Sequence, residues 1–258
     1  QDLGLGSLAP STVTAILHRH GLIAPEASAA ARPWQRFEHE RPNALWQIDF
    51  KGHVDTPGGR CHPLTLLDDH SRFNMALRAC ARQEAATVRE QLIEVFRTYG
   101  LPVRINADNG APWGSPSEPG QVTALTLWLI RLGIRVSFSR PYHPQTNGKD
   151  ERFHRSLKAE VLNGNSFTDL QQAQGAFDRW REVYNHQRPH QALGMATPAS
   201  RYRMSERGYP EVLPAIEYGP DDAVVTVKAL GQMKFHGKRY KLSNALRGLP
   251  VVIRPAAD

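Results

Sequence analysis

Apolar and polar residues alternate with a period of two between residues 45 and 79, a spacing typical of β-strands. Three runs show the pattern, Leu45–Val54, His62–Leu67 and Phe73–Ala79. Asp68–Ser71, which separates the last two runs, has the residue types of a tight turn. The pattern therefore predicts three consecutive strands, the last two joined by a short connection.

Beyond residue 83 the apolar spacing changes to three and four, which predicts a helix over residues 83–99, ended by Gly100. Strands and helices then alternate. The predicted elements are a strand at 102–106, a helix at 121–132, a strand at 134–138, a basic helix at 149–162 and a helix capped by Thr168. This order predicts an α/β fold, with a mixed five-stranded sheet flanked by helices.

The two ends of the chain have different textures. Residues 10–21 predict one short helix with Ser11 as its N-cap, and an Ala-rich stretch containing Pro25 and Pro33 follows as a linker. Past Pro210 the pattern predicts short strands and a hairpin turn at 236–238, as in a small β-barrel or sandwich. We therefore expect three parts: an N-terminal segment (1–40), a core (41–203) and a small basic β domain (204–258), which is expected to be incomplete.

Composition narrows the class of protein. The chain has 258 residues, 40% of them hydrophobic, and a net charge of +7, which favours a polyanionic partner. From Ala223 onward seven basic residues stand against one acid, although a basic tail can also serve solubility alone. The sequence contains no apolar run long enough for a membrane span. Its two cysteines, Cys61 and Cys80, form no zinc-type motif, so we expect no zinc site and a location in the reducing cytoplasm. Because the chain starts with Gln1, we also expect it to be a piece of a longer product.

Three carboxylates are the candidates for chemistry. Asp49 and Asp108 are associated with strand-like runs, and Glu151 opens the basic helix. Acids brought together from separate elements can hold divalent cations, and a basic surface beside them suits phosphodiester substrates. The alternatives are that Asp108 begins an Asp-Asn-Gly turn and that Asp49 is a satisfied polar group at a sheet end.

Other acids compete with Glu151 for the third position. Asp150 is adjacent but points about 100° away on a helix, so the two cannot face one site equally. Glu160 lies more than two turns further along. Asp68 and Asp69 fit a turn after the second strand, and Asp69 is also a candidate to support the site.

Several segments resemble, in order, signatures of the DDE integrase core of bacterial insertion-sequence transposases, which are close to retroviral integrases. They are Trp46–Asp49, Leu67–Phe73, Asp108–Gly110, Ser139–Lys158, Tyr184–Leu193 and Thr197–Pro198, within residues 41–203. The resemblance implies a ribonuclease-H-like fold and polynucleotidyl transfer. It also implies that Asp49, Asp108 and Glu151 hold two Mg²⁺ ions, with Mn²⁺ as a substitute. The segment between Asp108 and Glu151 is longer than the family usually has, and the Gly- and Pro-rich stretch 111–120 is expected to form a longer loop.

As a function, the resemblance implies a DNA transposase that cuts at element ends and joins the 3′-hydroxyl to target DNA. A phage or retroelement integrase and a catalytically silent, transposase-derived DNA-binding protein are the alternatives. The expected partners are double-stranded DNA and further copies of the chain, with action at the bacterial nucleoid in the cytoplasm.

Basic residues of the last core helix are the first candidates for DNA contacts. Arg155 and Lys158 lie four and seven residues after Glu151 and therefore share its helix face, with a solvated basic face as the alternative. Lys149 and Arg152 face other directions. The further candidates come from the preceding loop and from the C-terminal segment: His143, Asn147, Lys238, Arg239 and Lys241.

Overall fold

The computed structural model describes residues 10–22, 38–114, 122–139 and 148–254, and the chain divides into two compact units, Gln1–Glu38 and His39–Asp258. In the first unit, α1 covers Pro10–Arg19, which confirms the predicted helix. Because α1 already begins at Pro10, Ser11 lies inside the helix, and its prediction as N-cap is wrong. The predicted linker with Pro25 and Pro33 lies outside the described residues.

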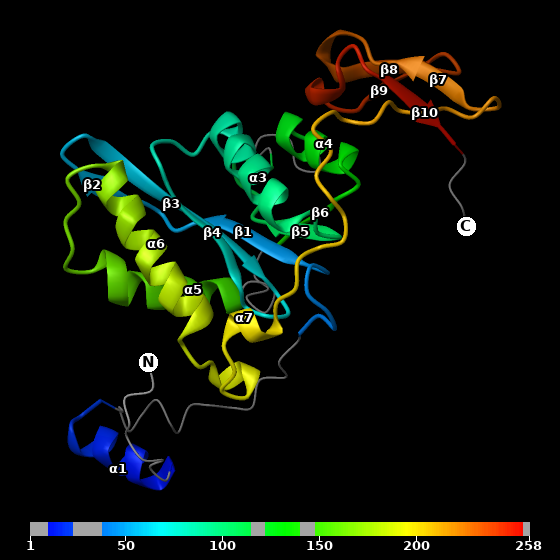
Figure 1. Cartoon of the computed structure of the whole chain (residues 1–258). Coiled ribbons are helices and arrows are strands. Elements are labelled where there is room, and N and C mark those ends of the chain that lie inside the picture. The colour runs from blue at the N-terminus through cyan, green and yellow to red at the C-terminus, as the bar shows by residue number, and fades with distance from the viewer. Residues whose placement is uncertain (1–9, 23–37, 115–121, 140–147, 255–258) are drawn as a thin grey trace. The chain divides into compact units, whose positions relative to one another are not determined.

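A mixed sheet forms the centre of the second unit (Figure 1). Its strands are β1 (Trp46–Phe50), β2 (Val54–Thr56), β3 (Gly59–Asp68), β4 (Asn74–Cys80), β5 (Arg104–Ala107) and β6 (Arg135–Phe138). β3 pairs antiparallel with β1, β2 and β4, whereas β1–β5 and β5–β6 are parallel pairs. This arrangement fits the ribonuclease-H-like fold that the resemblance to the integrase core implies.

The sheet has six strands instead of the predicted five because the first predicted strand is interrupted. β1 and β2 both pair with β3, and residues 51–53 between them belong to neither strand. Gly52 has φ +64°, a left-handed conformation that breaks the extended backbone and that glycine adopts without a steric penalty.

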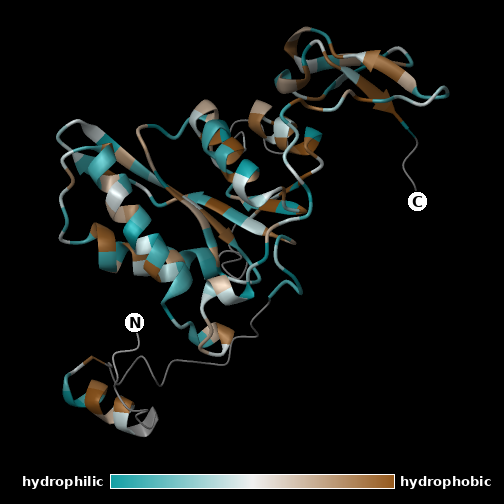
Figure 2. Cartoon of the chain, viewed as in Figure 1, coloured by the Kyte–Doolittle hydropathy of each residue, from teal (hydrophilic) through white to brown (hydrophobic). Residues whose placement is uncertain are grey.

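Helices cover both faces of the sheet (Figure 1). They are α3 (Ala85–Tyr99), α4 (Ala124–Arg131), α5 (Gly148–Leu157), α6 (Leu170–His186) and the short α7 (Pro198–Arg201), and a π-helical turn at Lys158–Leu162 continues α5. One buried apolar cluster joins α3 and α4 to the sheet, and a second joins α5 and α6 to the opposite face. Figure 2 shows the consequence in hydropathy, with apolar residues in the middle of the sheet and helices that present both apolar and polar residues.

Side chains of β1 are divided between the two faces because neighbouring residues of a strand point in opposite directions. Trp46 and Ile48 belong to the cluster under α3 and α4. Gln47 and Asp49 therefore point to the face that α5 covers. The alternation that buries one side of β1 thus places the first candidate acid beside the helix that carries the third.

Capping side chains begin two of these helices. Thr123 and Thr126 form a reciprocal capping box at the start of α4. At α6 the side chain of Asp169 accepts a hydrogen bond from the Gln172 amide, at 2.8 Å. The predicted cap at Thr168 is therefore wrong by one residue, since the helix begins at Leu170 and Asp169 has the extended conformation of an N-cap.

The C-terminal strands are β7 (Ala223–Thr226), β8 (Gln232–Phe235), β9 (Lys238–Lys241) and β10 (Pro250–Ile253). β7 pairs antiparallel with β10, and β8 with β9 through the predicted hairpin turn. The predicted barrel is not confirmed, because in the described residues these strands form two separate two-stranded sheets. The other part boundaries remain predictions; residues just beyond the expected end of the core still contact it, for example Ser205 through its amide and the Tyr99 carbonyl, at 2.9 Å.

Among the residues that the structure describes, no helix combines the length and the apolar character needed to cross a lipid bilayer.

Candidate active site

Asp49 lies in β1 at the middle of the sheet, opposite Thr65 of β3. Its carboxylate Oδ1 accepts a hydrogen bond from the Phe50 amide at 2.8 Å, and its carbonyl accepts one from Thr65 Oγ1 at 3.1 Å. Burial, together with the nearby Asp108 carboxylate, raises the pKa of Asp49 to about 6. The side chain is 34% exposed, so a ligand from solvent can still reach it.

Asp108 follows directly after β5, the parallel neighbour of β1. The carboxyl ends of two adjacent parallel strands therefore carry Asp49 and Asp108 at the same edge of the sheet. Asp108 is exposed, yet the surrounding protein desolvates its carboxylate enough to raise its pKa. Its Oδ1 also accepts a hydrogen bond from the Gly110 amide at 3.0 Å, so the turn predicted as an alternative is present as well.

The first turn of α5 presents its two acids to different surroundings. Glu151 is exposed, whereas Asp150 is only 4% exposed. Burial raises the pKa of Asp150 well above its ordinary value, and the charges of Asp49 and Glu151 raise it further. Oδ1 of Asp150 is buried and has no hydrogen-bond partner. A buried carboxylate oxygen in this state requires a proton or a cation to balance it.

His154 lies one turn after Asp150 and between the candidate acids. Its Nε2 shares a hydrogen bond with Thr65 Oγ1 at 2.8 Å and lies 3.6 Å from Asp150 Oδ2, and its Nδ1 lies 3.9 Å from Asp49 Oδ2. Burial lowers the pKa of His154 to about 3, so the imidazole is neutral at neutral pH. A neutral imidazole is the form that ligates metal ions.

Asp49, Asp150 and His154 fit a divalent cation. Each offers one donor atom, and these atoms all lie within 4.8 Å of one another. Two carboxylates and an imidazole are a donor set that suits Mn²⁺ and related ions. A bound cation would also balance the charge of the Asp150 carboxylate, whose Oδ1 has no hydrogen-bond partner. Asp108 is near enough to Asp49 for its charge to raise the pKa of Asp49. Asp150 and His154 also lie beside Asp49, whereas Glu151 is exposed at the surface.

Sequence reasoning placed Glu151 ahead of Asp150 and did not single out His154. A signal for both was available in the spacing of the helix. Phe153 and Leu157 are buried against the sheet. Asp150 precedes them by three and seven residues, and His154 is adjacent to Phe153, so both fall on the stripe that faces the sheet.

The predicted DNA contacts lie in different places. Arg152, Arg155 and Lys158 are exposed on α5 and the π turn, and Lys238, Arg239 and Lys241 are exposed along β9. Lys149 differs from them, because its ammonium lies 2.5 Å from the Asp69 carboxylate and its side chain is only 18% exposed. His143 and Asn147 lie outside the described residues.

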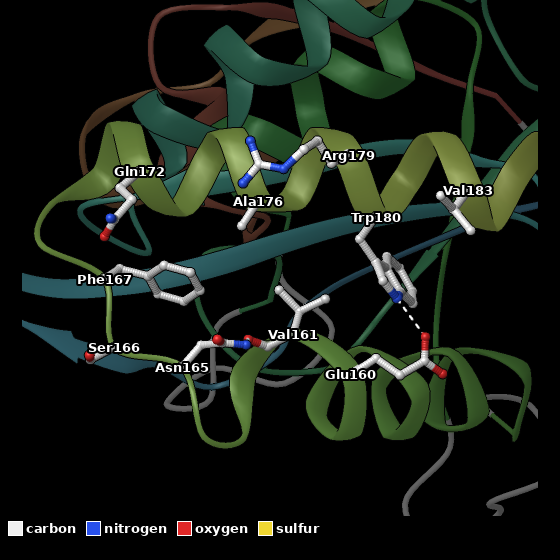
Figure 3. A pocket seen from close by; sticks show the side chains of 10 residues that line it. All are labelled: Glu160, Val161, Asn165, Ser166, Phe167, Gln172, Ala176, Arg179, Trp180 and Val183. Atoms are coloured by element: carbon white, nitrogen blue, oxygen red, sulfur yellow. Dashed lines mark hydrogen bonds between the residues drawn. The ribbon is translucent and has the colours of Figure 1, made fainter.

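A pocket of about 490 Å³ lies between the π turn and α6 (Figure 3). Its lining residues come from these two elements and from their connection: Glu160, Val161, Asn165, Ser166, Phe167, Gln172, Ala176, Arg179, Trp180 and Val183. Glu160 accepts hydrogen bonds from Trp180 Nε1 at 2.8 Å and from Arg188 Nη2 at 2.5 Å. Glu160, which competed with Glu151 for the third position, is therefore engaged here. The pocket is not lined by Asp49, Asp108, Asp150 or Glu151.

Two models of the integrase core domain match the chain in succession. One covers residues 39–144 and the other residues 132–198. Together they extend from residue 39 to residue 198, which is more than half of the chain and includes every candidate acid. The chain belongs to the integrase core family.

Proteins encoded by bacterial insertion elements are among the relatives of this chain. The integrase-core chain is 29% identical over 158 residues to an uncharacterised 31.7 kDa protein of insertion element IS407 from Burkholderia multivorans. It is 30% identical over 158 residues to an uncharacterised 39.2 kDa protein of insertion element IS476 from Xanthomonas euvesicatoria. In both cases 61% of this chain is covered, against 54% and 44% of the relative, so the chain spans about half the length of these proteins.

A solved structure supports the fold. A chain in the cryo-EM structure of the simian T-cell lymphotropic virus intasome with PP2A regulatory subunit B56 gamma aligns with a TM-score of 0.52. The alignment covers 91% of this chain and 79% of that chain, at 18% identity. The resemblance to insertion-sequence proteins of the retroviral integrase superfamily, expected from the sequence, is confirmed by these comparisons.

Proposed function

We propose that this integrase core is the catalytic part of an insertion-sequence transposase, which cuts DNA at element ends and joins the 3′-hydroxyl to target DNA. The observation that carries the proposal is that Asp49, in β1, and Asp108, directly after β5, lie at the same edge of two adjacent parallel strands. The Asp49 pKa is raised to about 6, mainly by burial and in part by the Asp108 carboxylate. Raised carboxylate pKa values in a partly exposed site are typical of functional acids.

Asp49, Asp108 and Glu151 are the proposed holders of divalent cations, Mg²⁺ or Mn²⁺, with two ions in the active site. When bound, such ions polarise a phosphodiester and lower the pKa of an attacking water or hydroxyl. Asp49 is positioned by its own strand and by Thr65. Glu151 is exposed next to Asp150, and in this proposal it turns toward Asp49 when a cation and DNA are present.

Asp150 and His154 would support Asp49 from the buried side of the site. His154 is fixed by Thr65, since their side chains share a hydrogen bond, and it lies between the two aspartates. This arrangement restricts the orientation of Asp49 without adding a charge, because the imidazole is neutral. Restricting the ligand geometry in advance lowers the reorganisation needed when substrate arrives.

DNA would lie along the exposed basic residues next to these acids. Arg155 follows Glu151 by one helical turn and Lys158 by two, and all three are exposed. Arg152 and the basic residues of β9 are further proposed contacts, as are His143 and Asn147, which precede α5 in the sequence. Duplex DNA, further copies of the chain and a place at the bacterial nucleoid in the cytoplasm complete the proposal.

Of the two alternative functions, one uses the same strand-transfer reaction and the other has no catalytic activity. A phage or retroelement integrase would perform the same reaction on different ends. A catalytically silent DNA-binding derivative has no need for Asp49 and Asp108 at one sheet edge, and the buried, unpartnered oxygen of Asp150 would be a cost without a benefit.

Strand transfer tests the proposal. A pre-cut duplex carrying the ends of the mobile element that encodes the chain is incubated with supercoiled plasmid and Mg²⁺ or Mn²⁺. We expect joining by the wild type and none by Asp108→Asn, with DNA affinity unchanged in the variant. Joining at the wild-type rate by Asp108→Asn would remove Asp108 from the site, and DNA binding without nicking or joining by the wild type would favour the silent derivative.

A further inference from the structure

Lys149, in the first turn of α5, forms an ion pair with Asp69, which follows β3 of the sheet. Its ammonium lies 2.5 Å from Asp69 Oδ2 and 3.2 Å from the Asp69 carbonyl oxygen. The side chain of Lys149 is 18% exposed and that of Asp69 is 3% exposed. This pair is therefore largely removed from solvent, unlike the surface pairs of Arg82, Arg97 and Arg254, whose basic side chains are roughly half exposed or more.

Asp69 is itself attached to the strand that carries the first acid. Its Oδ1 accepts a hydrogen bond from Gln47 Nε2 at 2.9 Å, and its amide donates to the Leu45 carbonyl at 2.9 Å. Gln47 precedes Asp49 by two residues in β1, so both side chains point to the same face of the sheet. The preceding Asp68 has a different task, because it accepts hydrogen bonds from Ser71 and shapes the turn.

Lys149 is also the residue directly before the two acids of α5. A connection of three side chains, Gln47, Asp69 and Lys149, thus runs from β1 through the β3–β4 turn to the first turn of α5. Further along α5, His154 is attached to Thr65 of β3. The helix is therefore fixed to the sheet at two points, one on each side of Asp150 and Glu151.

We propose that Lys149 and Asp69 are a positioning pair for the acids of α5, and that Lys149 acts on the reaction through this pair and not as a DNA contact. The inference rests on the proposed function in that it assigns the pair a role at the same site. A buried pair suits this task because removing either partner leaves the other charge uncompensated. Neither side chain is required to touch DNA or a cation.

The sign of the charge separates the two roles. For a DNA contact, Lys149→Met weakens DNA binding, and Asp69→Asn, which removes a negative charge, strengthens it. For a positioning pair, both variants have the same effect, because each breaks the same link. Arg82→Met, which removes one exposed positive charge elsewhere, is the matched control.

The experiment uses the full chain and three measurements on each variant. Hydrogen exchange follows the amides of the first two turns of α5. Calorimetry follows the affinity for Mn²⁺ without DNA, and fluorescence anisotropy follows binding to a random-sequence duplex. We expect both variants to exchange faster in α5 and to lose Mn²⁺ affinity by about tenfold, with DNA affinity changed by no more than about twofold, and turnover lower by up to about a hundredfold. Lys149→Arg should restore part of each loss.

Two results would overturn the positioning role. One is exchange and Mn²⁺ affinity that match the Arg82→Met control in both variants. The other is opposite effects of the two substitutions on DNA binding. If the wild type shows no turnover on any DNA while hydrogen exchange still responds to both substitutions, the proposed function fails and the pair stands.

Discussion

At the scale of single residues, the decisive feature is that ionisable side chains of α5 are buried against β1 and β3. Burial raises the pKa of Asp150 and lowers the pKa of His154, so that it disfavours the charged form of both side chains. Each group therefore lowers stability in the pH range where it would normally be ionised, and each is well placed for a cation. Both effects can be measured without DNA.

The substitution Asp150→Asn separates the effect of the buried carboxylate on stability from its effect on cation binding. In EDTA at pH 8 we expect the variant to be more stable by about 1–3 kcal/mol in urea unfolding, because it removes a buried charge with an unpartnered oxygen. The same substitution should lower the affinity for Mn²⁺ by at least about tenfold in calorimetry. Asp55→Asn, at an exposed acid of β2, is the control. An unchanged Mn²⁺ affinity would exclude any contribution of Asp150 to cation binding.

His154 makes stability depend on pH. Its folded-state pKa of about 3 lies below the ordinary value of 6.5, so the unfolded chain binds the proton more readily. The contribution of the neutral imidazole is complete above pH 6.5 and is lost as the pH falls toward 3. Between pH 7 and pH 5 the wild type should lose roughly 2 kcal/mol more than His154→Asn in EDTA. Equal losses in the two proteins would show that His154 is protonated in the folded state.

At the scale of elements, α6 protects the outer edge of the sheet. Its residue Asn185 accepts a hydrogen bond from the Asn74 amide at 2.8 Å and donates one to the Asn74 carbonyl at 2.9 Å. Gln174 makes the equivalent pair with the Ala79 amide and the Leu77 carbonyl. These side chains replace a neighbouring strand along β4, an edge that would otherwise offer unpaired backbone groups to another chain.

Asn185→Ala should expose this dependence. The substitution leaves the Asn74 amide and carbonyl buried without partners, which we expect to lower the free energy of unfolding by about 1–3 kcal/mol. Gln171→Ala, at an exposed position of the same helix, should change it by less than about 0.5 kcal/mol. Urea unfolding provides the comparison, and equal values for the two variants would show that water satisfies β4.

At the scale of the whole molecule, the net charge is +7, and the basic side chains fall into two groups with different surroundings. Some basic side chains serve the fold, such as Arg207, which donates to the Pro102 and Leu132 carbonyls. Others are exposed beside the candidate acids, such as Arg155 and Lys158. Only the second group is suited to release counterions from DNA.

Salt dependence measures that group. Neutralising Arg155 and Lys158 together should lower the slope of log affinity against log salt by about 1.8, since each phosphate contact contributes about 0.9. Neutralising Arg60 and Arg82 removes the same charge from other exposed positions and should leave the slope nearly unchanged. Equal slopes for both double variants would make the basic face of α5 a solvated surface.

The order of the main core helices and of five of the six core strands could be predicted from the sequence, as could the positions of Asp49 in the first strand and of Asp108 just after the fourth predicted strand. Both follow from local rules: a period of two or of 3.6 residues, and the preference of glycine for helix ends such as Gly100. The resemblance to the integrase core was also contained in the sequence, since its signatures are contiguous segments.

Tertiary structure alone decided which side chains meet. The β1–β3 register places Asp49 opposite Thr65, and the docking of α5 then buries Asp150 and His154 beside them. The attachment of Lys149 to Asp69 likewise joins residues 80 positions apart. Such contacts depend on sheet register and helix docking, which are set by the packing of the whole core and not by neighbours along the chain.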